Sequence, residues 1–101
     1  MDPRFFVEPP VISSTLRWGE VSLPASISEA DLDRIILAVM TPRLQKTAVV
    51  LHRALERCKE LGLPISADIL GARLGALAVT DRMEGAGDLS KWRYSEVRLK
   101  D

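Results

Sequence analysis

The spacing of apolar residues predicts a first helix that begins after Ser28 and ends near Thr41-Pro42. Ser28 is a suitable N-cap, and the acidic residues that follow it face the positive end of the helix dipole. The apolar stripe of this helix has the spacing of one buried face and consists of Leu32, Ile35, Ile36 and Val39.

A second helix is predicted from Pro42, which suits a first helical position, to about Leu61, with Gly62 as its stop. Its apolar face consists of Leu44, Ala48, Leu51, Leu55 and Cys58. Roughly opposite lies a cationic stripe that consists of Arg43, Lys46, Arg53 and Arg57. Such a stripe can meet phosphates or an acidic partner, although most charged helix faces are simply solvated.

A third helix is predicted over residues 65–79, with Ser66 as its N-cap. Its buried face is expected to hold Ile69, Leu70, Leu74 and Leu77. The other positions carry mostly glycine and alanine, and Arg73 is the one long cationic side chain among them. Small residues let another backbone or helix approach closely, so this helix is expected to pack against a neighbour.

After the third helix the pattern changes to that of a β-hairpin. Residues 79–84 can be extended, residues 85–88 (Gly-Ala-Gly-Asp) supply a turn, and residues 92–99 alternate between two faces. Val97 and Leu99 mark the face that packs on the core, and the opposite face holds Trp92, Tyr94, Glu96 and Arg98. Glu96 and Arg98 stand side by side on that face, where they can form an ion pair.

The end of the chain also carries a resemblance. The run Arg82-Met83-Glu84, the turn Gly87-Asp88 and the final strand from Tyr94 to Leu99, which contains Glu-Val-Arg-Leu, resemble the end of a bacterial C-terminal domain family of unknown function. The resemblance extends back to about Ile27. It implies a winged-helix-like architecture, and it implies no activity, because the family is uncharacterised.

Residues 1–27 read as an N-terminal arm with one or two short strands, one of them over residues 16–23. The arm contains Phe5, Phe6 and Trp18, and chains do not usually leave that much apolar area in a free tail. We therefore expect the arm to pack on its own core, and the alternative is a homodimer formed through the arm.

Composition places this chain among one-domain globular proteins. It has 101 residues, a formal net charge of +0 and a single cysteine, Cys58, which permits no internal disulfide. The zero net charge gives little support for nucleic-acid binding. Neither a secretory signal nor a membrane span is recognisable, so a cytoplasmic location is the default expectation.

No catalytic, cofactor-binding or metal-binding set of residues is indicated by the sequence. His52 is the only histidine and is read as a structural or surface residue, and Cys58 is read as a small core residue. The candidate partner-binding residues are Arg73, Trp92, Tyr94, Glu96 and Arg98. The plainer alternative is that Trp92 and Tyr94 cover the core or the arm.

These patterns together predict an α+β, winged helix-turn-helix-like fold. Residues 28–101 would form three helices and a C-terminal hairpin, and residues 1–27 the arm. The favoured function is a non-enzymatic protein-protein interaction or dimerisation module, without membrane contact. The alternative is a winged-helix DNA-binding regulator, which would use the third helix, the hairpin tip and the cationic stripe.

Overall fold

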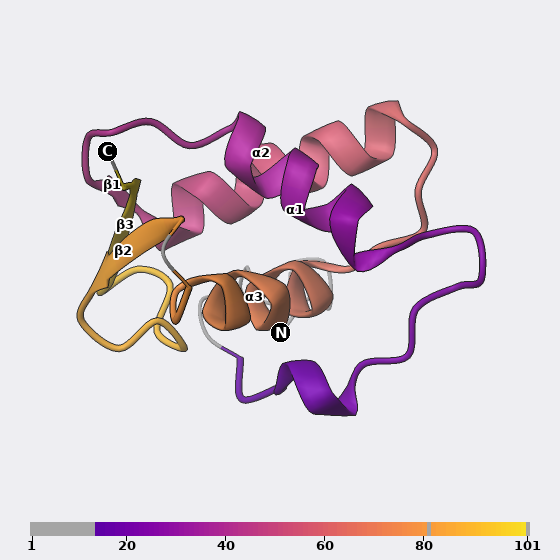
Figure 1. Cartoon of the computed structure of the whole chain (residues 1–101), viewed down its shortest axis with the longest axis horizontal. Coiled ribbons are helices and arrows are strands. Elements are labelled where there is room, and N and C mark those ends of the chain that lie inside the picture. The colour runs from indigo at the N-terminus through magenta and orange to yellow at the C-terminus, as the bar shows by residue number, and fades with distance from the viewer. Residues whose placement is uncertain (1–13, 81, 101) are drawn as a thin grey trace, which may run out of the picture.

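The computed structural model describes residues 14–80 and 82–100, and within them the chain is α+β. Three helices accompany a three-stranded antiparallel sheet of order β1-β3-β2. In chain order the elements are the 3₁₀ turn η2 (Trp18–Glu20), α1 (Glu29–Ala38), β1 (Gln45–Lys46), α2 (Thr47–Glu60), α3 (Ala67–Leu77), β2 (Met83–Ala86) and β3 (Glu96–Leu99). Figure 1 shows α3 between α1 and η2, with the sheet at one end of the helices.

Helices α1 and α3 begin where the sequence predicts, because each has a serine N-cap. The Ser28 hydroxyl accepts from the Asp31 backbone N–H at 3.2 Å, and the Asp31 carboxylate accepts from the Ser28 N–H at 3.0 Å. This reciprocal pair holds the pKa of Asp31 below its ordinary value, since the Ser28 N–H favours the ionised carboxylate. In α3 the Ser66 hydroxyl accepts from the Ile69 N–H at 3.3 Å.

Helix α2 ends as predicted at Gly62, which adopts a φ of 71°. The Gly62 N–H donates to the Lys59 carbonyl at 3.1 Å, and the Leu63 N–H donates to the Cys58 carbonyl at 2.8 Å. These two bonds form a Schellman motif, which needs a left-handed residue after the helix and therefore favours glycine.

The start of α2 differs from the prediction. The helix begins at Thr47 rather than at Pro42, and residues 45–46 form the short strand β1. The N-cap residue Lys46 provides no side-chain bond; instead the Thr47 N–H donates to the Ser95 carbonyl and the Ala48 N–H to the Trp92 carbonyl. Leu44, expected on the buried face, lies before the helix and is 48% exposed. Contacts with residues almost 50 positions away therefore set where this helix begins.

The strands of the hairpin are shorter than predicted. Residues 85–86 belong to β2 rather than to the turn, and β3 begins at Glu96 rather than at Trp92. Only Gly87, with a φ of 83°, uses the conformational freedom of glycine in the predicted turn. Between the strands, residues 87–95 form a loop of successive turns, which we call the β2–β3 loop. As expected for the core face, Val97 is fully buried, at the centre of the sheet between Gln45 and Gly85.

The predicted strand over residues 16–23 is wrong. This part of the arm forms the 3₁₀ turn η2, and the third strand of the sheet is β1. Trp18 and Leu23 are half-buried against the core, and Ile27 belongs to it, so from residue 14 onward the arm lies on its own chain. Phe5 and Phe6 lie outside the described residues.

The core lies where the three helices meet one face of the sheet. Its fully buried members include Leu32, Ile36, Val50, Leu51, Cys58, Leu70, Leu74, Leu77, Met83 and Val97. Cys58 is thus a core residue as predicted, and burial raises the pKa of its thiol. The predicted stripes of α1 and α3 are confirmed except at their edges, where Val39 and Ile69 are half-buried.

Trp92 is also part of the core, being only 3% exposed, and its close approach to α3 requires glycine at position 71. A Cβ atom on Gly71 would lie 2.5 Å from Cζ2 of the indole, whereas a Cβ on Gly75 would meet nothing within 4 Å. We therefore expect Gly71→Ala to destabilise the protein by about 1–3 kcal/mol through overpacking. Gly75→Ala, the matched control, should stabilise it by up to about 1 kcal/mol through helix propensity.

Chemical denaturation measures the free energy of unfolding of both variants. The gain in helix propensity is the same for both, so the difference between them reports the contact with Trp92. Equal stability of Gly71→Ala and Gly75→Ala would contradict the close packing of Trp92 on α3.

Candidate functional site

Arg73, the one long cation of α3, is bound within the chain. Its Nε and Nη2 donate to the two carboxylate oxygens of Asp33 in α1 at 2.6 and 2.9 Å, and its Nη1 lies 3.6 Å from Glu29. The side chains of Arg73 and Asp33 are each 14% exposed. The hydrogen bonds to Asp33 raise the pKa of Arg73 above its ordinary value. Arg73, which the sequence suggested as a partner-binding residue, therefore joins α3 to α1 within the chain.

The N-terminal arm closes over this ion pair. The guanidinium carbon of Arg73 lies 4.8 Å from the centre of the Trp18 ring, and the Trp18 Nε1 donates to Glu29 at 3.2 Å. A cation over an indole face is attracted by the ring, more strongly when water is partly excluded. Trp18, Glu29, Asp33 and Arg73, which we call the Arg73 cluster, therefore fasten the arm to α1 and α3.

Helix α3 consequently has no exposed residue. Every position from Ala67 to Leu77 is buried or half-buried, because α1, α2 and η2 all pack against this helix. A shallow crevice of about 260 Å³ remains where the arm, α3 and the β2–β3 loop meet. Its α3 wall consists of Gly71, Ala72, Gly75 and Ala76. Of the two glycines, Gly71 serves the close packing expected from the sequence, against Trp92, whereas Gly75 borders open space.

The other candidate partner-binding residues are dispersed. Trp92 lies in the core, whereas Tyr94, two positions later, is 78% exposed. They do not share a strand face as predicted, because residues 92–95 belong to the β2–β3 loop. Arg98 pairs across the sheet with Glu84 at 2.6 Å rather than with its neighbour Glu96, which is exposed. Trp92 is therefore absent from the predicted surface, whereas Glu96 and Arg98 lie together on the exposed face of β3.

The predicted cationic stripe is also divided. Arg53 and Arg57 lie on α2, but Arg43 and Lys46 precede the helix, in a loop and in β1. All four side chains are exposed. Arg57 has an ion pair with Glu60 at 3.5 Å, one turn further along the helix. The stripe is therefore divided into two pairs of cations, and Arg57 of the pair on α2 lines a groove.

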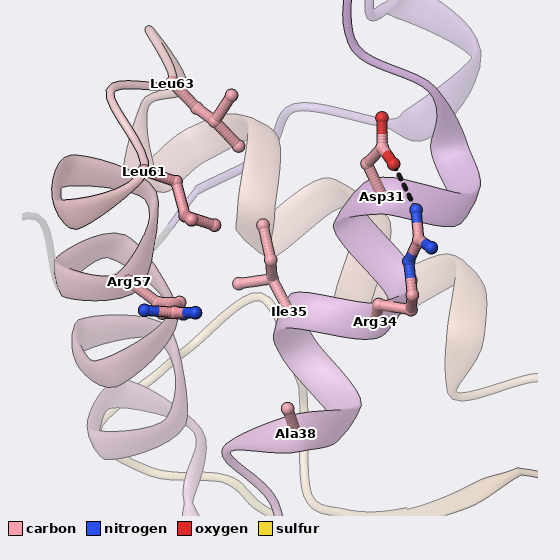
Figure 2. A pocket seen from close by; sticks show the side chains of 7 residues that line it. All are labelled: Asp31, Arg34, Ile35, Ala38, Arg57, Leu61 and Leu63. Atoms are coloured by element: carbon pink, nitrogen blue, oxygen red, sulfur yellow. Dashed lines mark hydrogen bonds and ion pairs between the residues drawn. The ribbon is translucent and has the colours of Figure 1, made fainter.

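That groove runs between α1 and the end of α2, with a volume of about 470 Å³ (Figure 2). Ile35 and Leu61 point toward each other across it, and Arg34 is turned toward Asp31, with which it forms an ion pair (Figure 2). The residues that line it are Asp31, Arg34, Ile35, Ala38, Arg57, Leu61 and Leu63. We call it the α1/α2 groove; it combines an apolar floor with two arginines.

Of the residues that line this groove, only Arg57 is among the candidates that the sequence indicates, as part of the cationic stripe. Leu61 was assigned to the helix end and Ile35 to the core stripe, which the structure confirms for Ile35 at 7% exposure. Leu61 is 49% exposed, because it is the C-cap residue that follows α2, where the chain turns away at Gly62. An apolar residue next to a predicted helix stop was the available signal.

Within residues 14–80 and 82–100 no group of three or more His, Cys, Asp or Glu side chains is arranged to hold a metal ion. His52 lies on the surface, 72% exposed and 4.0 Å from Glu56. None of the helices in the described part of the chain is long and apolar enough to cross a membrane.

Comparisons of this chain with protein-family models, with curated proteins and with solved structures gave no match. The resemblance to a bacterial domain family therefore stays a prediction from the residues of the C-terminal part.

The Arg73 cluster makes a prediction about stability. Asp33→Ala leaves a largely buried guanidinium without its main partner, and we expect it to cost on the order of 2 kcal/mol of folding free energy. The matched control is Glu84→Ala, which breaks an ion pair whose side chains are 45% and 41% exposed. Exposed pairs contribute at most about 1 kcal/mol. Urea denaturation of both variants measures the difference, and equal losses would contradict a structural role for Asp33.

Proposed function

We propose that this chain is a non-enzymatic protein-interaction module built on a winged-helix-like scaffold. The order of its elements, helix-strand-helix-helix-strand-strand, and the sheet order β1-β3-β2 support the scaffold assignment. In that assignment α2 and α3 are the helix-turn-helix pair, and the β2–β3 loop is the wing. Fold alone does not assign activity, so the functional argument depends on which surfaces are available.

The single observation that carries the proposal is that no residue of α3 is exposed. Helix-turn-helix regulators place their recognition helix in the major groove, where exposed polar side chains read the bases. Here every α3 residue is at least half-buried, and its one long cation is held by Asp33. A helix in that state offers no side chains for base readout. Two concave, partly apolar surfaces remain accessible in the described part of the chain, the crevice beside α3 and the larger α1/α2 groove.

A DNA-binding regulator is the competing function, and it is supported by the exposed cations of the stripe. Fluorescence polarisation with a random-sequence duplex at about 50 and about 200 mM salt separates the two functions. Non-specific binding by DNA readers lies near about 10⁻⁴–10⁻⁶ M at physiological salt and tightens as salt falls. We expect no binding in that range even at the lower salt concentration.

Salt-steep binding that weakens in the double variant Arg53→Ala/Arg57→Ala would replace the proposal with the regulator function. Glu56→Ala, which removes an exposed acidic residue on the same helix, is the matched control for surface changes on α2.

A further inference from the structure

We propose that the α1/α2 groove binds an amphipathic helix of a partner protein, with a leucine-like anchor on Ile35 and an acidic residue beside Arg57. The inference rests on the proposed function and specifies its partner by chemistry. Three features of the groove support it: its length, its apolar floor and the pairing of its charges.

The length of the groove suits a helix. Along α1 its lining residues Asp31, Arg34, Ile35 and Ala38 span two turns, which corresponds to about 10 Å. Helices that dock in grooves present anchors at positions i, i+3 or i+4 and i+7, which cover the same length. The partner helix would lie along α1 and contact the end of α2.

The floor of the groove leaves apolar surface for an anchor. Leu61 is 49% exposed and points toward Ile35 across the opening (Figure 2), and Leu63 follows in the loop. A leucine-sized side chain that enters between Leu61 and Ile35 removes apolar surface from water on both partners, which favours binding. Ala38 leaves room at the end of the groove, since its side chain is a single methyl group.

The charges of the groove favour an acidic partner over a basic one. Asp31 is engaged within the chain, because its carboxylate accepts from the Ser28 N–H and from Arg34. Arg57 is 52% exposed, and its bond to Glu60 is long at 3.5 Å. A partner carboxylate can therefore replace Glu60 on the guanidinium with a shorter, bidentate contact. A partner lysine would meet two arginines, Arg34 and Arg57, and would have to compete with Arg34 for Asp31.

Synthetic peptides test this preference on the full chain. The probe is a helical peptide of about 15 residues with leucines spaced i, i+3 and i+7 and glutamates beside them, and its twin has lysines in place of glutamates. We expect the glutamate peptide to bind about threefold to tenfold tighter. Amide shift changes in NMR spectra should concentrate in residues 31–38 and 57–63. Equal affinity of the two peptides, or shift changes elsewhere, would overturn the proposal.

Two variants locate the site and one serves as control. Ala38→Arg places a long side chain in the groove and should abolish binding, while its exposed position leaves the fold intact. Arg57→Glu should reverse the preference toward the lysine peptide. Arg53→Glu makes the same charge change one turn earlier, outside the groove lining, and should preserve the glutamate preference. If Arg53→Glu reverses the peptide preference as fully as Arg57→Glu does, the preference depends on long-range charge rather than on contact with Arg57, and the proposed site is wrong.

Sedimentation of the free protein distinguishes a second copy as the occupant. A dimer that Ala38→Arg converts to monomer would assign the groove to self-association and overturn the acidic partner helix. If the unmodified protein binds neither the peptides nor DNA, this inference alone is rejected. Salt-steep DNA binding would instead reject the proposed function.

Discussion

The close contact between Trp92 and Gly71 packs the β2–β3 loop against α3. The indole lies so close to α3 that a single added Cβ would overlap it. The backbone carbonyl of Trp92 accepts from Ala48, and that of Ser95 accepts from Thr47, so the same loop also closes the N-terminus of α2. The hydroxyls of Ser95 and Thr47, both buried, add a hydrogen bond of 2.8 Å. The β2–β3 loop is therefore a structural support for two helices rather than a free wing.

Helix α3 is covered on several sides by other parts of the chain. Five of the eleven residues of α3 are alanine or glycine, and α1, α2 and the arm all pack against this helix. The arm adds Trp18 over the paired Arg73, which leaves the Arg73 side chain only 14% exposed. Close packing and base recognition make opposite demands on the same helix face, because one needs small covered residues and the other needs long exposed ones. In this chain every residue of α3 is buried or half-buried, as close packing requires.

The α1/α2 groove has a different origin. It exists because α2 stops at Gly62, and the Schellman motif turns the chain back before Leu61 is covered. Arg34 and Arg57 line the groove while keeping their charged ends in water, which long cationic side chains do readily. The way the backbone ends α2 thus leaves apolar surface next to charged side chains. Protein interfaces combine the same two features, an apolar core and a polar rim.

Short-range physical rules let the sequence by itself determine much of this protein. Ser28, Ser66 and Gly62 mark helix ends through hydrogen bonds that span three to five residues, and periodicity identifies the buried faces of α1 and α3. Only the tertiary structure decided where α2 begins, that β1 exists, that Trp92 lies inside, and that Arg73 is bound by a carboxylate 40 positions away. Each of these depends on groups far apart in the chain, whose meeting no local pattern encodes.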